Sequence, residues 1–101
     1  MPIKQSLCLP LFMGKETVLD DFFAELKAIG YAAVEFWGRD GVDDYINIVE
    51  TARKHGLVVA SMCGHGTLED GLNKLENHDR IEAELRESID IAVECGIPGV
   101  I

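Results

Sequence analysis

The sequence predicts an α/β fold in which parallel strands alternate with helices in the order βαβαβαβ. Short apolar runs of strand length alternate with longer segments whose apolar residues recur at helical spacing. Three times a helical segment ends in glycine and an apolar run follows at once, at Gly30, Gly56 and Gly96. Because this alternation is typical of parallel strands joined by helical crossovers, we expect one parallel sheet and one domain over residues 1–101.

The first unit is expected to have a strand near residues 3–9 and a helix near 17–29. Polar and apolar side chains alternate in the strand, and Pro10 ends it because proline lacks a backbone donor. Thr17 followed by Asp20 is similar to a capping box, which predicts the start of the helix. One helical stripe carries its apolar residues: Leu19, Phe22, Phe23, Leu26 and Ile29.

The next two strands are expected near residues 32–37 and 57–63, on either side of a helix near 43–55. Both runs are almost continuously apolar, which is typical of parallel strands buried on both faces. Asp43 or Asp44 is the candidate N-cap of the helix between them.

The last helix is expected near residues 79–95, followed by a strand near 97–101. Asn77 or Asp79 is its candidate N-cap, and Glu82 three residues after Asp79 completes a second capping pair. Besides the loop marked by Gly14, we expect a short loop at 38–41 and a long one at 64–78. Loops as long as the second are usually functional in a compact domain.

This order is that of the first part of a TIM (β/α)8 barrel. A complete barrel takes about 250 residues, and the fourth apolar run only begins near residue 97. We therefore expect the amino-terminal (βα)3β portion of such a barrel, with parallel strands and outer helices. The rival interpretation is a small, self-contained three-layer α/β sheet.

Composition narrows the possible partners. The 101 residues are 48% apolar and 27% charged, values of an ordinary globular protein, with a formal net charge of −9. Eighteen acidic residues against nine basic ones would repel a phosphate backbone, so nucleic-acid binding is not expected. No apolar run approaches the roughly 20 residues of a membrane span, and no signal peptide is evident, so a cytoplasmic location is expected.

The chain has three cysteines, Cys8, Cys63 and Cys95. Their odd number, wide spacing and lack of a CxxC pair argue against a disulfide framework or a zinc ribbon. Reduced thiols in a cytosolic protein are the simplest interpretation.

Candidate site residues lie at the carboxyl ends of the strands, where α/β folds place their sites. Glu35 and Trp37 are expected to face the barrel interior, with Val34 and Phe36 facing the helices. Glu35 is then either a substrate-binding carboxylate or a structural acid paired with a base on a neighbouring strand, for example Lys4.

His65 is the third candidate for substrate binding. It lies between Gly64 and Gly66, which let the backbone approach a ligand closely. Its imidazole suits a substrate hydroxyl or a metal, and the alternative is a loop histidine that caps backbone groups. Cys63 with His65 is too little for a metal site, since zinc takes three or four protein ligands.

Five short stretches of the chain resemble the xylose isomerase-like superfamily of TIM barrels. Residues 33–37, AVEFW, are similar to its second strand. GHGT at 64–67, GLN at 71–73, ENH at 76–78 and Ile97-Pro98 resemble the hydroxypyruvate isomerase branch. The resemblance covers the whole chain, but only the amino-terminal half of such a barrel.

The resemblance implies a small hydroxy-carbonyl or sugar substrate and a divalent metal ion, Mg, Mn, Co or Zn. Paired carboxylates would move a proton between adjacent carbons through an enediolate. The family's metal ligands and catalytic glutamates lie on later strands, so no residue here takes either role. Glu35, Trp37 and His65 carry over only as positions that line the site, and the chain alone is expected to be inactive and to bind no metal.

Other functions stay open at this stage. A ketose 3-epimerase of the same superfamily is the nearest alternative, and a small non-catalytic α/β module that binds or oligomerises is the second. The superfamily's DNA-repair endonuclease branch is disfavoured by the acidic balance. An isolated half-barrel would expose two sheet edges, so self-association is also expected, either as a homo-oligomeric half-barrel pair or as an ill-defined aggregate.

Overall fold

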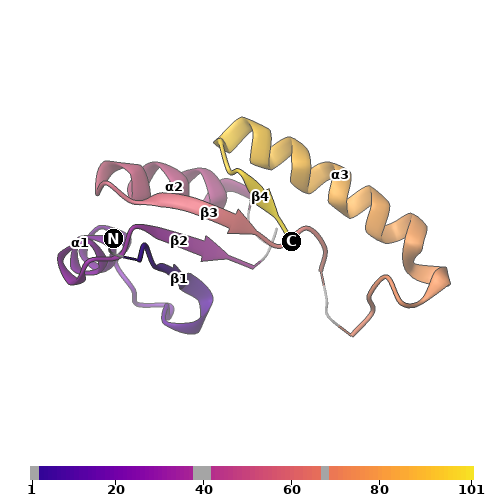
Figure 1. Cartoon of the computed structure of the whole chain (residues 1–101), viewed down its shortest axis with the longest axis horizontal. Helices are drawn as coiled ribbons and strands as arrows, with labels where there is room; N and C mark the ends of the chain where they lie inside the picture. Colours follow the sequence, from indigo (N-terminus) through magenta and orange to yellow (C-terminus); the bar gives the residue numbers. More distant parts are fainter. Residues whose placement is uncertain (1–2, 38–41, 67–68) are drawn as a thin grey trace.

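The computed structural model describes residues 3–37, 42–66 and 69–101, with the backbone alone at 42–44 (Figure 1). The expected loop at 38–41 lies outside these residues. The strands are β1 (Ser6–Cys8), β2 (Ala33–Phe36), β3 (Val58–Met62) and β4 (Gly99–Val100). The helices are α1 (Leu19–Ile29), α2 (Val42–Lys54) and α3 (His78–Cys95). The strands form one parallel sheet in the order β1-β2-β3-β4, so the predicted α/β class is confirmed.

The helices match the expected ranges closely, whereas each strand is shorter than expected. β1 stops at Cys8 because Leu9–Leu11 forms a 3-10 turn that contains Pro10. β4 has two residues instead of five. Gly30, Gly56 and Gly96 have positive φ angles of 116°, 77° and 70°, which confirms that a left-handed glycine follows each helix.

The predicted helix starts are wrong in detail. α1 begins after Val18, and the Thr17 hydroxyl instead accepts a hydrogen bond from the Gly14 N–H at 2.8 Å. α2 begins at Val42, so Asp43 and Asp44 lie inside the helix and not before it. A short polar side chain near a helix start caps only if the local turn aims it at the free N–H groups.

The start of α3 needs the same correction. Asn77 occupies the N-cap position, but its side-chain amide donates to the Gly71 carbonyl at 3.3 Å and caps nothing. Asp79 lies within the first turn, where a negative charge suits the helix dipole. The expected pairing of Asp79 with Glu82 as a capping box is therefore wrong.

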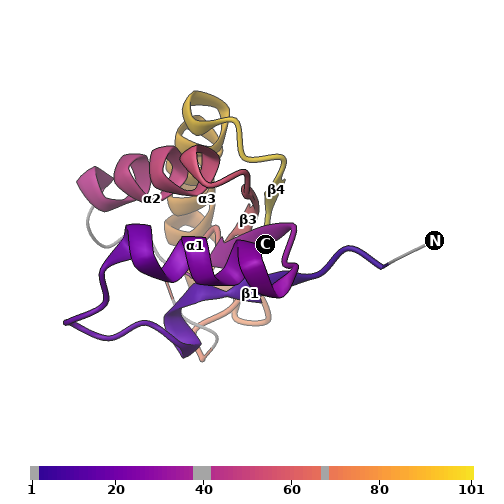
Figure 2. The same cartoon turned by 90° about the vertical axis from the view of Figure 1, so that its left-hand side faces the viewer.

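All three helices pack on one face of the sheet around a single core (Figure 2). The strands contribute alternate side chains that point to this face, and the helices contribute one stripe each. The strand members are Leu7, Val34, Phe36, Val59 and Met62, and the helix members are Phe23, Leu26, Tyr45, Val49, Ala52, Ala92 and Cys95. The rings of Phe36 and Tyr45 stack across the β2–α2 contact at 4.9 Å. In the described part of the chain, no helix has the length and apolar character that crossing a membrane requires.

An ion-pair cluster joins the start of α1 to the end of α2. One carboxylate oxygen of Asp20 accepts hydrogen bonds from Lys54 Nζ at 3.0 Å and from His55 Nε2 at 2.9 Å. The hydrogen bond from His55, and then that from Lys54, holds the pKa of Asp20 below its ordinary value. The folded state therefore favours the ionised carboxylate more than the unfolded state does.

Asp20→Asn is expected to lower the melting temperature at pH 7. A carboxylate with a depressed pKa stabilises the fold above its ordinary pKa of 3.8, and this contribution is lost as the pH falls through the lowered value. The difference between wild type and variant should therefore shrink in acid, as measured by thermal unfolding between pH 7 and pH 2. Asp21→Asn, which removes the same charge from the same turn, is the control, and an equal effect from it would contradict the role of the cluster.

Candidate functional site

A row of aligned residues crosses the face of the sheet that the helices leave uncovered. The parallel register pairs Cys8 with Glu35, Glu35 with Ser61, and Ser61 with Gly99. The Ser61 hydroxyl donates a hydrogen bond to Glu35 Oε1 at 2.6 Å. We call these four residues the open-face row. It lies toward the carboxyl ends of the strands, where α/β folds bind their ligands.

An irregularity in the β2–β3 register creates this pairing. Val34 aligns with Val59, but the next residue, Glu35, aligns with Ser61, so Ala60 is an extra residue in β3. Strict alternation from the buried Val59 would turn Ser61 toward the helices. The extra residue reverses the alternation, as β-bulges do, and brings the serine hydroxyl to the carboxylate.

Glu35 is half-buried between two core residues, Val34 and Phe36, which point to the helices as predicted. Its hydrogen-bond partner is Ser61, so Lys4, the example given for a structural ion pair, is wrong as its partner. Lys4 is exposed and precedes β1, whereas Ser61 comes from the neighbouring strand. The Ser61 hydroxyl binds Oε1, so Oε2 lies outside this hydrogen bond.

Trp37 follows β2 directly and keeps 50% of its surface exposed. It therefore lies at the same end of the sheet as the open-face row and is available to a ligand. Sequence reasoning placed it correctly at the strand end, but the ring is neither enclosed nor part of the core cluster.

Cys63 lies one residue beyond β3, and its backbone N–H donates to the Phe36 carbonyl at 3.3 Å. Burial raises the pKa of the Cys63 thiol, and the nearby Cys8 and Glu35 raise it further. At neutral pH Cys63 is therefore a neutral thiol and a weak hydrogen-bond donor, and the thiolate needed for nucleophilic attack is disfavoured. Cys8, Cys63 and Cys95 are all free cysteines in this structure.

Gly64 fixes the loop that carries His65. Its N–H donates to the Ile101 carbonyl at 2.6 Å, and its carbonyl accepts from the buried Ser88 hydroxyl at 2.8 Å. Gly66 N–H donates to Glu84 Oε2 at 3.3 Å, so the loop is tied to both β4 and α3. No side chain fits at residue 64, because a Cβ there would overlap Leu85 and approach Val100 to 2.8 Å.

His65 is half-buried, and its Nδ1 atom is buried without a hydrogen-bond partner in the structure. A polar atom in this state is a candidate for hydrogen bonding to a ligand. Among the described residues, no hydrogen bond or ion pair joins His65 to Glu35 or Trp37. The structure brings Glu35, Ser61, Cys8 and Cys63 together, and it places His65 and Trp37 on the loops beyond the same strand ends.

The described residues do not fit a metal site by themselves. Within them, no group of three or more His, Cys, Asp or Glu side chains is placed to hold a metal ion. Any metal that the family resemblance implies would need ligands from elsewhere.

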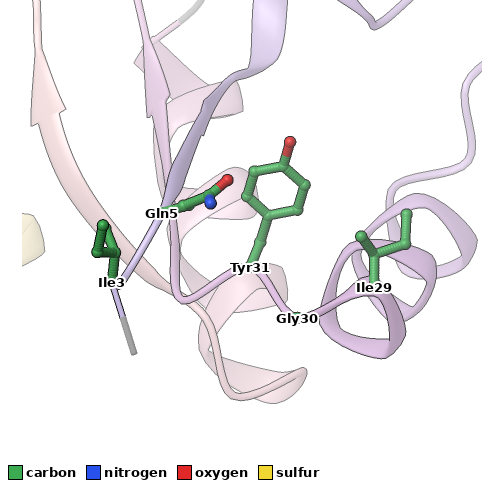
Figure 3. Close-up of a pocket in the computed structure, with 5 residues that line it drawn as sticks. All are labelled: Ile3, Gln5, Ile29, Gly30 and Tyr31. Carbon is green, nitrogen blue, oxygen red and sulfur yellow. The ribbon is translucent and has the colours of Figure 1, made fainter. Parts of the chain in front are cut away.

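A shallow pocket of about 140 Å³ lies at the other end of the sheet (Figure 3). It is lined by Ile3, Gln5, Ile29, Gly30 and Tyr31. These residues precede β1 and β2, so the pocket is remote from the carboxyl ends of the strands. It holds no carboxylate, histidine or thiol, and we do not place the functional site there.

Comparisons with protein-family models, with curated proteins and with solved structures each found no match to this chain. Its function is therefore argued from its own residues and their arrangement.

Gly64→Ala is expected to destabilise the fold by about 1–3 kcal/mol, because the added methyl group overpacks the contact between β4 and α3. Chemical denaturation measures the loss. Gly14→Ala is the matched control, since a Cβ at residue 14 meets nothing within 4 Å. Equal stabilities of the two variants would show that the chain does not pack closely at Gly64.

Glu35→Gln is expected to speed alkylation of Cys63 by iodoacetamide at pH 8, by about twofold or more. Removing the negative charge lowers the pKa of Cys63 toward its ordinary value and so raises the thiolate fraction. Peptide mass spectrometry separates the three thiols. Cys95, whose charged neighbours are Glu94, Arg53 and Glu50, is the internal control and should not change. An unchanged rate at Cys63 would contradict its proximity to Glu35.

Proposed function

We propose that this chain forms the first half of the substrate chamber of a metal-dependent isomerase resembling hydroxypyruvate isomerase. Such an enzyme moves a proton between adjacent carbons of a small hydroxy-carbonyl compound through an enediolate. One observation carries the proposal: the strands follow one another in sequence order, the helices share one face, and the other face presents the open-face row.

The strand order β1-β2-β3-β4 supports a barrel in which each new strand is added on the same side of the one before it. Doubly wound sheets reverse their strand order partway, which places helices on both faces. Here the order runs from β1 to β4 without reversal, and no helix of the described chain covers the second face. Four further units added in the same direction would close eight strands and enclose the open-face row inside the barrel.

Glu35 is the residue we propose for binding a substrate hydroxyl. Ser61 holds Oε1, and Oε2 is then oriented to accept a hydrogen bond from the substrate. A hydrogen bond to an ionised carboxylate is shorter and stronger than a neutral one, so it would fix the substrate's orientation. We propose Nδ1 of His65 and the ring of Trp37 as the other walls of the same chamber.

Proton transfer itself is not assigned to this chain. Glu35 is the one acid of the open-face row, whereas the proposed reaction needs a carboxylate pair. The resemblance puts that pair, and the metal that would polarise the substrate carbonyl, on later strands. The contribution of the residues present is to bind and orient the substrate.

The test starts from the reading frame after Ile101. It is expected to encode about four more βα units, and the longer product should isomerise hydroxypyruvate with a divalent metal. In D2O, NMR should show deuterium entering at the carbon that receives the proton. The 101-residue chain should show no turnover above a metal-only blank, because it lacks the carboxylate pair.

In the longer product, Glu35→Gln should raise KM about tenfold with a smaller change in kcat. The reason is that losing a binding contact weakens the binding of the substrate and of the transition state by similar amounts. Glu25→Gln, an exposed charge removal on α1, is the control. A stop codon directly after Ile101 in an intact gene, or turnover by the 101-residue chain, would contradict the proposal. Epimerisation of a ketose without hydroxypyruvate turnover would also contradict it.

A further inference from the structure

We propose that Glu84 and Ser88 of α3 are positioning residues for His65, and that they act through the glycines on either side of it. The two side chains stand four residues apart, so they project from the same side of the helix. They hold the loop so that the imidazole can bind a ligand. The inference rests on the proposed function for the identity of that ligand, which is taken to be a substrate hydroxyl group.

Ser88 is a polar residue on the buried side of α3. This helix buries Ile81, Ser88, Ala92 and Cys95. A serine within a helix often turns its hydroxyl toward its own helix backbone or toward solvent, whereas the Ser88 hydroxyl donates to the Gly64 carbonyl at 2.8 Å. An apolar side chain would fill this position without needing a partner. The hydroxyl therefore indicates that the contact with Gly64 is what position 88 provides.

Glu84 holds the loop on the other side of His65. Its Oε2 accepts a hydrogen bond from the Gly66 N–H at 3.3 Å and another from Arg80 Nη1 at 3.1 Å. Arg80 Nη2 also donates to the Asp70 carbonyl at 2.9 Å. The guanidinium therefore joins the carboxylate to a later part of the same loop, which limits the movement of Glu84 and of Gly66 together.

These contacts fix the backbone around His65 and do not use its Nδ1 atom. Gly64 is fixed further, because its N–H donates to the Ile101 carbonyl at 2.6 Å and a side chain there would overlap Leu85. The buried Nδ1 of His65 has no hydrogen-bond partner in the structure. A histidine with a structural role would be expected to use this atom, since buried polar atoms are normally paired. A held backbone with an unused ring nitrogen is the arrangement that a binding side chain on a loop requires.

The consequence for the proposed enzyme is a change in substrate binding and not in proton transfer. A hydrogen bond weakens steeply when its angle departs from linearity, so a small displacement of the ring would weaken the contact with the substrate hydroxyl. Proton transfer is not assigned to His65. Loss of either anchoring contact is therefore expected to raise KM more than it lowers kcat.

The first measurement follows the ring resonances of His65 by heteronuclear NMR in the 101-residue chain, and it needs no substrate. Ser88→Ala and Glu84→Ala should each shift these resonances. Glu84→Gln should bring them back toward the wild-type positions, because an amide oxygen can also accept the Gly66 N–H. The ring resonances of His55, which lies beyond the end of α2, should stay unchanged in all three variants.

Glu82→Ala is the matched control. It removes a carboxylate of α3 that pairs with Arg86 four residues later, just as Glu84 pairs with the arginine four residues before it. Glu82 makes no printed contact with the loop at 64–66, so the His65 resonances should not shift. Far-UV circular dichroism checks that each variant folds, and the Glu84 variants decide the outcome if Ser88→Ala does not.

The second measurement is a double-mutant cycle in the longer product. Ser88→Ala should raise KM about threefold with a smaller change in kcat, and it should have no further effect when His65→Ala is already present. A role confined to stability would instead leave the effect of Ser88→Ala on KM the same in both backgrounds.

Unchanged His65 resonances in the alanine variants, or an equal shift from Glu82→Ala, would overturn the proposal. An effect of Ser88→Ala on KM that persists in the His65→Ala background would also overturn it, because Ser88 would then act without His65. Shifted resonances in a chain whose longer product has no isomerase turnover would contradict the proposed function, and they would still support the positioning of His65 by α3.

Discussion

The structure depends on one constraint: each strand lies beside the one before it, and all strands run the same way. A parallel connection needs a helical crossover, and crossovers have one hand, so successive helices fall on the same face. This constraint explains both faces of the sheet. It gathers three helices over one core, and it leaves a second face on which a carboxylate, a hydroxyl and a thiol lie in register.

The helix layer is held together by a contact that repeats from one unit to the next. Lys27 of α1 donates to the Gly56 carbonyl after α2 at 3.2 Å, and Arg53 of α2 donates to the Cys95 carbonyl of α3 at 2.6 Å. Each cation stands three residues before the glycine that follows its own helix, and each reaches the carboxyl end of the next helix. A positive group there satisfies a free carbonyl and suits the helix dipole. The corresponding residue of α3 is Val93, which is 77% exposed.

Periodicity was enough to predict the fold class, the three helices and the helix-ending glycines, because these depend on local chemistry and on one apolar stripe per element. The strand ends and helix starts were not predictable in this way. Thr17 and Asn77 have capping chemistry, but nearby backbone groups at Gly14 and Gly71 compete for their side chains. The sequence identifies Glu35 as a charged residue within a strand, but it does not indicate Ser61 as the partner. The partner depends on an extra residue in β3, and nothing in the apolar run from 57 to 63 indicates where that residue falls.

The open-face row also bears on our proposal that Glu35 has a functional and not a stabilising role. A buried or half-buried carboxylate gives up hydration, and one serine hydroxyl replaces only part of it. An apolar residue at position 35 would avoid this loss of hydration free energy. The adjacent strand residues, Val34 and Phe36, are apolar and belong to the core. Residues that break the local pattern without adding stability are the ones expected at functional positions. The register irregularity points the same way, because it turns Ser61 toward the carboxylate and fixes one of its two oxygens. In the function that we propose, this arrangement prepares the carboxylate to accept a hydrogen bond from a substrate hydroxyl group.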